Sequence, residues 1–198
     1  MRNILLVGLL SLLATSCAIK APISNKYRLT QYSSDKLTST RSQHTLLITS
    51  PEAVEGYQSE QMIYSTKPFA LNSFTKNGWI STPAGMLYPL LIQSLQQSGY
   101  FRAIASSAYA DKTDYRLDTQ LIELQQNFTI KPSVLQMKIK AVVTRVSDNR
   151  MISSRTFRQQ IPCSQDTPYG GVIAANRATC ILTKAISQFT ISSINHDH

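Results

Sequence analysis

Few side chains in this 198-residue sequence are of the types that perform catalysis or bind metal ions. Of the three histidines, His196 and His198 belong to the C-terminal sequence INHDH, which we expect to be a frayed end rather than a metal site, and His44 opens a predicted strand. Asp118 and Glu123 lie five residues apart in another predicted strand, so their carboxylates should face opposite sides unless a bulge intervenes. The motifs of zinc proteases, serine hydrolases and phosphate-binding loops are absent. The sequence therefore predicts no catalytic residues, no metal site and no cofactor.

One cysteine does suggest chemistry, because Cys17 follows a hydrophobic N-terminal segment. Arg2 is the only charged residue before Lys20, and residues 4–14 are almost entirely apolar. A positive start, an apolar centre and a small-residue exit are typical of a secretory signal peptide. The apolar run is too short to cross the core of a bilayer, which needs about 20 residues. We therefore predict an exported protein with a signal peptide at residues 1–16.

The residues Ala14-Thr15-Ser16-Cys17 resemble the lipobox of bacterial lipoproteins, with Ala14 where leucine is commoner. The resemblance implies cleavage after Ser16 and a diacylglyceryl thioether on the Cys17 sulfur, with palmitate among the acyl chains. Stable anchoring needs more than one acyl chain, and a triacylated cysteine meets that requirement. Ala18, where aspartate usually marks inner-membrane retention, favours the periplasmic face of the outer membrane. The alternative is an ordinary signal peptide with an incidental cysteine.

The chain is basic but sparsely charged. Its formal net charge is +9, yet charged residues make up only 16% of the sequence, unlike the concentrated basic stripe of nucleic-acid-binding proteins. An exported protein rarely meets nucleic acid, so we predict no nucleic-acid partner. Acidic phospholipid head groups or an acidic partner surface are the expected targets. A solvated surface that happens to be basic is the alternative.

Hydrophobic periodicity predicts a single α+β domain over residues 27–194, with a lipid-anchored tether at 17–26 before it and a frayed tail at 195–198 after it. Amphipathic helices are predicted at residues 82–98 and 170–194. The predicted strands are residues 26–32, 44–51, 57–64, 100–106, 114–128, 134–146 and 151–162. Such an order predicts a largely antiparallel, mixed sheet with both helices on one face.

Four local signals sharpen this prediction. Thr82 before Pro83 is typical of a helix N-cap followed by a first-turn proline. Asn77-Gly78 predicts a tight turn, and Asp148-Asn149 predicts the turn of a hairpin. The apolar residues of 114–128 switch from one face to the other in mid-strand, which predicts a bulge.

Cys163 and Cys180 remain once Cys17 is consumed by the lipid. An even number of cysteines in an oxidising compartment favours a disulfide, which would close a loop of about 17 residues and stabilise by roughly 3 kcal/mol. With Cys163 at the end of the last strand and Cys180 near the start of the last helix, the bridge would pin that helix to the sheet. Two buried free thiols are the alternative.

The chain as a whole resembles the ABC-type transport auxiliary lipoprotein family, which serves the paraquat-inducible and MCE lipid-transport systems. The resemblance rests on the order and spacing of YRL (27–29), LLITSP (46–51), Met62-Ile63-Tyr64 and Trp79 within 62–104, DYRLDTQLIEL (114–124), Phe157 and the alanine-rich last helix. The chain departs from the family at Gln58-Ser59-Glu60, where members often have a Leu-Asp/Asn-Arg-like triplet.

This resemblance implies a non-catalytic role. Family members accompany ABC transporters with MCE-domain proteins, which move phospholipids or other apolar molecules between the inner and outer membranes. This chain would dock the MCE-domain protein at the outer membrane. Its candidate contact segment holds Met62, Ile63, Tyr64 and Trp79, with burial of Trp79 in the core as the alternative.

Two other functions are alternatives. One is an assembly or pilot lipoprotein for an outer-membrane barrel or secretin, and the other is a periplasmic hydrolase whose site the sequence does not reveal. The sequence also leaves a homo-oligomer open.

Overall fold

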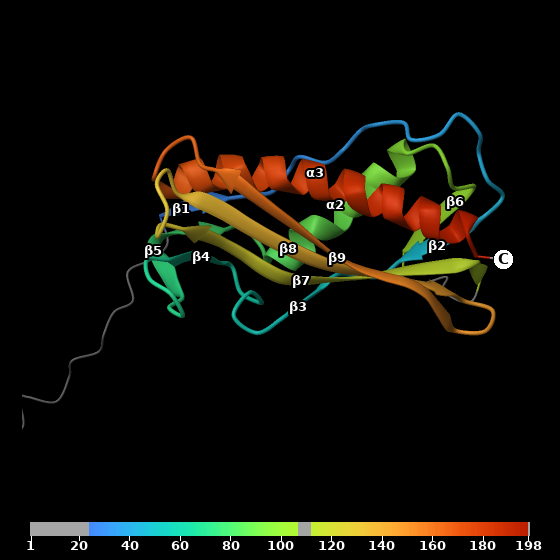
Figure 1. The fold of residues 1–198 in the computed structure, drawn as a ribbon, viewed down its shortest axis with the longest axis horizontal. Helices are drawn as coiled ribbons and strands as arrows, with labels where there is room; N and C mark the ends of the chain where they lie inside the picture. The colour runs from blue at the N-terminus through green and yellow to red at the C-terminus, as the bar shows by residue number, and fades with distance from the viewer. Residues whose placement is uncertain (1–23, 107–111, 198) are drawn as a thin grey trace, which may run out of the picture.

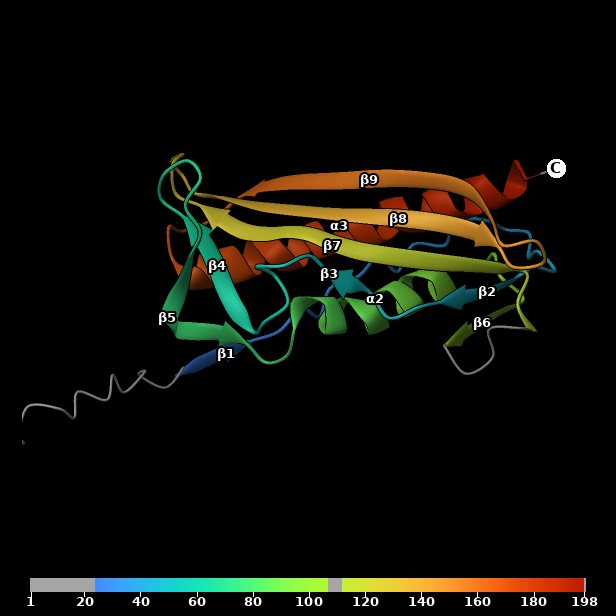
Figure 2. The ribbon, with the colours of Figure 1, turned by 90° about the horizontal axis from the view of Figure 1, so that it is seen from below.

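The computed structural model describes residues 24–106 and 112–197. The predicted signal peptide, the predicted cleavage position after Ser16, the predicted lipidation site Cys17 and His198 lie outside the described residues. The described chain forms one mixed sheet of nine strands, with both helices on the same face (Figure 1). Figure 2 shows the sheet from its other side, where the long strands lie in front of the helices. The predicted α+β class is confirmed.

The strands are β1 (Asn25–Tyr27), β2 (Thr45–Ile48), β3 (Glu52–Ala53), β4 (Gln61–Ser65), β5 (Asn72–Trp79), β6 (Ala103–Ser106), β7 (Tyr115–Asn127), β8 (Val134–Arg145) and β9 (Arg150–Pro162), and the helices are α2 (Pro83–Gln97) and α3 (Pro168–Asn195). One edge of β7 pairs antiparallel with β8 along its length, and β8 pairs in the same way with β9. The other edge of β7 is shared by β2, β3 and β4, which follow one another along it, all parallel to β7. The sheet continues from β2 to β6, and from β4 through β5 to β1. Within the described residues, the outer edge of β9 therefore has no strand partner.

The bulge predicted in β7 is confirmed. Its register against β8 shifts between Leu121 and Glu123, which leaves Ile122 without a partner residue opposite it. Because of this extra residue, Leu121 and Leu124 both face the helices and are both buried, although they are three positions apart. The bulge thus keeps one face of the 13-residue strand buried throughout.

Both helices begin with the same signal. Thr82 caps α2 by accepting a hydrogen bond from the Gly85 N–H (3.3 Å), as predicted, with Pro83 as the first helical residue. Thr167 caps α3 in the same way, so this helix begins at Pro168, two residues before the predicted start. Threonine at the N-cap and proline next to it satisfy or remove amides that have no partner inside the helix. The helices and the inner face of the sheet enclose one core whose fully buried members include Leu46, Ile48, Leu87, Leu91, Leu95, Leu117, Leu121, Met137, Ile139, Leu182 and Ile186.

The strand predicted at residues 26–32 is wrong beyond Tyr27. Residues 28–44 instead run without secondary structure across the outer side of the helices, as the blue trace above α3 shows (Figure 1). Their backbone groups find partners on α3, because the Asn176 Oδ1 accepts from the Thr30 N–H (2.8 Å) and the Gln31 N–H (3.2 Å). The Asn176 Nδ2 donates back to the Arg28 carbonyl (3.2 Å). A helix side chain thus takes the place of a neighbouring strand.

The turn predicted at Asn77-Gly78 is also wrong. Both residues lie inside β5, where Asn77 pairs with Asn25 of β1 and Gly78 pairs with both Lys26 and Gln61. At this point β5 lies between β4 and β1, and the register with β4 shifts. The turn of the β4–β5 hairpin lies at residues 66–71 instead. The turn predicted at Asp148-Asn149 is confirmed, and Asn149 has the left-handed backbone (φ 53°) that such turns require.

The predicted Cys163–Cys180 disulfide is not formed, and both residues are free thiols. Cys163 lies beside the start of α3, because Ser133 accepts from its N–H (2.8 Å) and the Gln126 amide joins Ser133 to Thr167. Cys180 is twelve residues beyond Pro168, which is about 18 Å along a helix. A disulfide needs the two Cα atoms within roughly 7 Å. Burial raises the pKa of the Cys163 thiol.

Asn176 should contribute measurably to stability, since it is buried with all its polar atoms bonded. We expect Asn176→Ala to lower the free energy of unfolding by about 2 kcal/mol. The substitution would leave the part-buried N–H groups of Thr30 and Gln31 without their acceptor. Urea unfolding would measure the loss, and hydrogen exchange at Thr30 and Gln31 should accelerate. The exposed Gln188→Ala on the same helix is the control and should change stability by no more than about 0.5 kcal/mol. Equal effects of the two variants would contradict this role.

Candidate functional site

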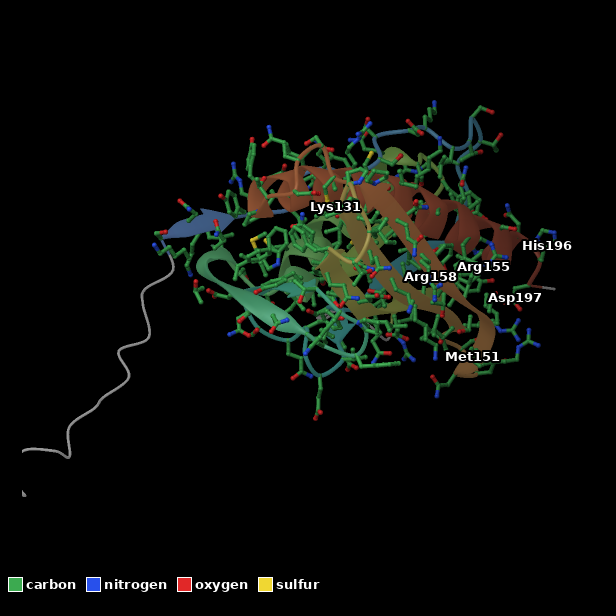
Figure 3. All side chains as sticks on the ribbon, turned by 60° about the vertical axis from the view of Figure 1, so that its left-hand side comes forward. Lys131, Met151, Arg155, Arg158, His196 and Asp197 are labelled. Atoms are coloured by element: carbon green, nitrogen blue, oxygen red, sulfur yellow. The ribbon has the colours of Figure 1, made fainter. Side chains whose placement is uncertain are left out.

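A hollow of about 670 Å³ lies between β9 and the C-terminal half of α3. We call it the β9–α3 groove. Its walls include Met151, Arg155 and Phe157 from β9, and Phe189 and Asp197 from α3 and the residues after it. Figure 3 labels Met151 and Arg155 along β9, and His196 and Asp197 at the end of α3. The groove therefore combines an unpaired strand edge with charged and apolar side chains.

Aromatic rings close the inner side of this groove. Phe157 and Phe189 meet edge to face, with ring centroids 5.5 Å apart. The Arg155 guanidinium lies 5.2 Å from the Phe189 ring centre and 5.9 Å from that of Phe157. A cation over aromatic faces is attracted by their negative quadrupole. This contact fixes the cation of an exposed residue at the entrance to the groove.

The predicted frayed tail is wrong for Asp197, which closes one end of the groove. Its side chain is 2% exposed and forms ion pairs with Arg150 (2.6 Å) and Arg145 (3.2 Å). The Tyr115 hydroxyl donates a third bond to it (3.3 Å), and burial together with the Asp197 charge raises the pKa of Tyr115. Arg145 also bonds Asp148 and thereby lowers the pKa of that carboxyl to about 2. At neutral pH this end of the groove is therefore a fixed network of opposite charges.

Asp197 and His196, the acidic and histidine side chains that line the groove, both contact other groups of the protein. The Nδ1 atom of His196 lies 2.7 Å from the Ser192 carbonyl, at the end of α3. Within residues 24–106 and 112–197, no three histidine, cysteine or acidic residues gather closely enough to hold a metal ion. The described geometry supports binding: an extended segment could add to the β9 edge through main-chain hydrogen bonds while its side chains meet the arginines and rings.

The two carboxylates considered in the sequence lie on the same face of the sheet, because the bulge falls between them. Each carboxylate, however, forms an ion pair with a different basic residue. Asp118 pairs with Arg116 (2.8 Å) and accepts from the Thr49 hydroxyl, and Glu123 pairs with Lys138 (2.9 Å). They therefore stabilise the outer face of the sheet and do not form an acid–base pair.

The structure does not present the predicted contact segment as one surface. Met62 and Trp79 belong to the core, with 4% and 3% of their surface exposed. Ile63 is half-buried, and Tyr64 stacks on Phe74 with centroids 4.4 Å apart. The alternative that Trp79 is a core residue is thus confirmed.

Sequence reasoning missed the β9–α3 groove. The available signal was the composition of residues 150–162, which contain three arginines and no acidic residue. Cationic side chains are typical of an edge strand.

The fold and the groove together define a two-layer α+β domain with an open sheet edge. The family model of the ABC-type transport auxiliary lipoprotein component matches residues 27–187. The chain belongs to this family, so it is an auxiliary component of ABC-type transport. Among the described helices, none is both long enough and apolar enough to span a membrane.

Solved structures share this fold. Protein XCC0632 from Xanthomonas campestris superposes with a TM-score of 0.81 at 20% identity, over 88% of this chain and 98% of that one. An uncharacterized protein superposes with a TM-score of 0.67 at 11% identity, over 84% of this chain and 98% of that one. Hypothetical protein CT253 from Chlamydia trachomatis superposes with a TM-score of 0.51 at 9% identity, over 77% of this chain and 96% of that one. No curated protein matches the chain.

The Asp197 network can be tested by Asp197→Asn. We expect it to lower the free energy of unfolding by about 2 kcal/mol, because charged hydrogen bonds to two arginines are weakened in a buried position. Glu60→Gln is the control, since Glu60 pairs with Lys26 where both side chains are 46% exposed, and it should cost less than about 1 kcal/mol. Denaturant unfolding of both variants gives the comparison. A smaller cost for Asp197→Asn than for Glu60→Gln would refute the network's importance.

Proposed function

We propose that this protein is a lipoprotein held by acylated Cys17 on the periplasmic face of the outer membrane, where it acts without catalysis. It docks the MCE-domain protein of an ABC transport system that moves phospholipids or other apolar molecules between the two membranes. Membership of the auxiliary lipoprotein family and the lipobox-like N-terminus support this role. The observation that carries the docking function is the β9–α3 groove with its unpaired strand edge.

The chemistry of this surface specifies the segment that it would bind. The outer edge of β9 offers main-chain donors and acceptors along a 13-residue strand. Arg155 and Arg158 are exposed, and β9 has no acidic residue to neutralise them. The groove beside the edge adds the Phe157 and Phe189 rings. An extended segment with acidic and apolar side chains is the matching partner.

In-cell photocrosslinking tests the docking surface directly. With benzoylphenylalanine in place of Met151 of β9, which lines the groove and is 62% exposed, we expect capture of an MCE-domain protein, identified by mass spectrometry. The exposed Thr75 of β5 is the matched control position and should capture none. Arg158→Glu should reduce capture at least tenfold, whereas Arg177→Glu on the exposed side of α3 should leave it unchanged.

Capture of a different protein in this experiment would contradict the proposed docking function. Capture of only a secretin or barrel protein would replace the proposal with the pilot or assembly function. Capture of only a second copy would make the β9 edge an interface between copies and contradict its use for docking.

The anchor has a separate test. Mass spectrometry of the exported protein should find Cys17 at the N-terminus with acyl chains, and Cys17→Ala should move the protein from the membrane to the soluble periplasmic fraction. An unmodified thiol, or wild-type protein that is already soluble, would overturn the anchoring.

A further inference from the structure

Exposed apolar side chains gather at the end of the molecule away from the groove. Phe69 is fully exposed, and Leu71 and Ile130 are 53% and 52% exposed. They lie in the β4–β5 turn and the β7–β8 turn, whose ribbons come together at one end of the sheet (Figures 1 and 2). The Phe128 N–H donates to the Ser65 carbonyl (2.8 Å) and fastens the two turns to each other. We call Phe69, Leu71 and Ile130 the apolar tip.

Packing within the fold does not explain Phe69. Its backbone is left-handed (φ 64°), a conformation that suits glycine and is unfavourable for a bulky residue. Its ring is nevertheless fully exposed, so the strained conformation is not compensated by burial. Strained exposed residues of this kind point to a contact outside the chain.

Aromatic rings support the tip from below. Tyr64 stacks on Phe74, and Phe128 meets both rings edge to face, at 5.9 Å and 6.2 Å. These three rings are half-buried and join the two turns. The tip is therefore a fixed protrusion of the sheet.

Each of the two turns of the tip also carries a basic residue. Lys67 of the β4–β5 turn and Lys131 of the β7–β8 turn are exposed, and Figure 3, which turns this end forward, labels Lys131 there. The acidic residue facing Lys131 is Asp166, whose carboxylate accepts from the Ser133 N–H (2.6 Å). Apolar side chains with lysines beside them are typical of surfaces that enter the interface of an anionic membrane.

The path of the chain leads to the same end. Both the N–H and the hydroxyl of Ser24 donate to the Lys76 carbonyl, at 3.2 Å and 3.1 Å. Ser24 lies seven positions after Cys17, so the Cα atoms of the two residues can be at most about 25 Å apart. An anchor at Cys17 would therefore hold this end of the domain close to the bilayer.

We propose that the apolar tip inserts into the surface of a phospholipid bilayer with anionic head groups. This inference rests on the anchoring proposed above. The sheet would then stand away from the membrane, and the Asp197 end of the β9–α3 groove would face the periplasm, where a partner from the opposite membrane would arrive.

The test compares two exposed apolar positions at opposite ends of the acylated full chain. Benzoylphenylalanine replaces Phe69 in one sample and Met151, which is 62% exposed, in the other. In vesicles of phosphatidylethanolamine and phosphatidylglycerol in equal parts, we expect at least tenfold more lipid adducts at position 69. Similar yields at both positions would overturn the inference.

Variants that reverse the charge of lysines distinguish insertion of the apolar tip into the bilayer from chance contact with lipid. Lys67→Glu with Lys131→Glu should lower the adduct yield at position 69 several-fold, while Lys36→Glu, an exposed lysine over the helices, should not. An unchanged yield in the double variant would contradict the electrostatic part of the proposal.

A mass spectrum of Cys17 from the same samples separates the two proposals. An acylated Cys17 without adducts at position 69 would refute tip insertion and leave the anchor intact. An unmodified Cys17 would refute the anchor, and the adduct yield of that chain with added vesicles would still decide the insertion.

Discussion

The two edges of β7 organise the molecule. On one edge a continuous antiparallel ladder with β8 and β9 makes the long part of the sheet, and on the other three short parallel strands take successive portions of the same edge. A bulge after Leu121 keeps Leu121 and Leu124 on the same buried face despite the switch in side-chain parity. Because β7 pairs on both sides along its length, β8 and β9 extend the sheet outward, and among the described strands none pairs with the outer edge of β9.

Local signals in the sequence predicted most of this scaffold. The strict alternation of residues 134–146 defined β8, the parity switch in 114–128 defined the bulge, and Thr82-Pro83 defined the start of α2. Each of these features is encoded by neighbouring residues, so a single sequence suffices to read it. The fold class followed from their order.

All but one of the errors involved partners that are distant in sequence. Asn77-Gly78 has turn chemistry, yet β1 and β4 recruit it into a strand. The exception is the Cys163–Cys180 prediction, which failed for a local reason: α3 begins at Pro168 and its helical rise carries Cys180 away. Asp197 belongs to a sequence typical of a frayed end, and only the folded sheet brings Arg145 and Arg150 to it. The groove was missed for the same reason, since β9 and α3 meet only in three dimensions.

The helix α3 connects the two surfaces that the fold exposes. Its 28 residues extend about 42 Å, from the turns beside the apolar tip to the Asp197 network beside the groove. Asn176 and Thr183 on this helix also hold the segment that leads from β1 to β2. A contact at the tip would therefore act on a packed helix and a continuous β-ladder. Such packing suits the proposed docking role, in which the β9 edge would be held at a fixed height above a membrane.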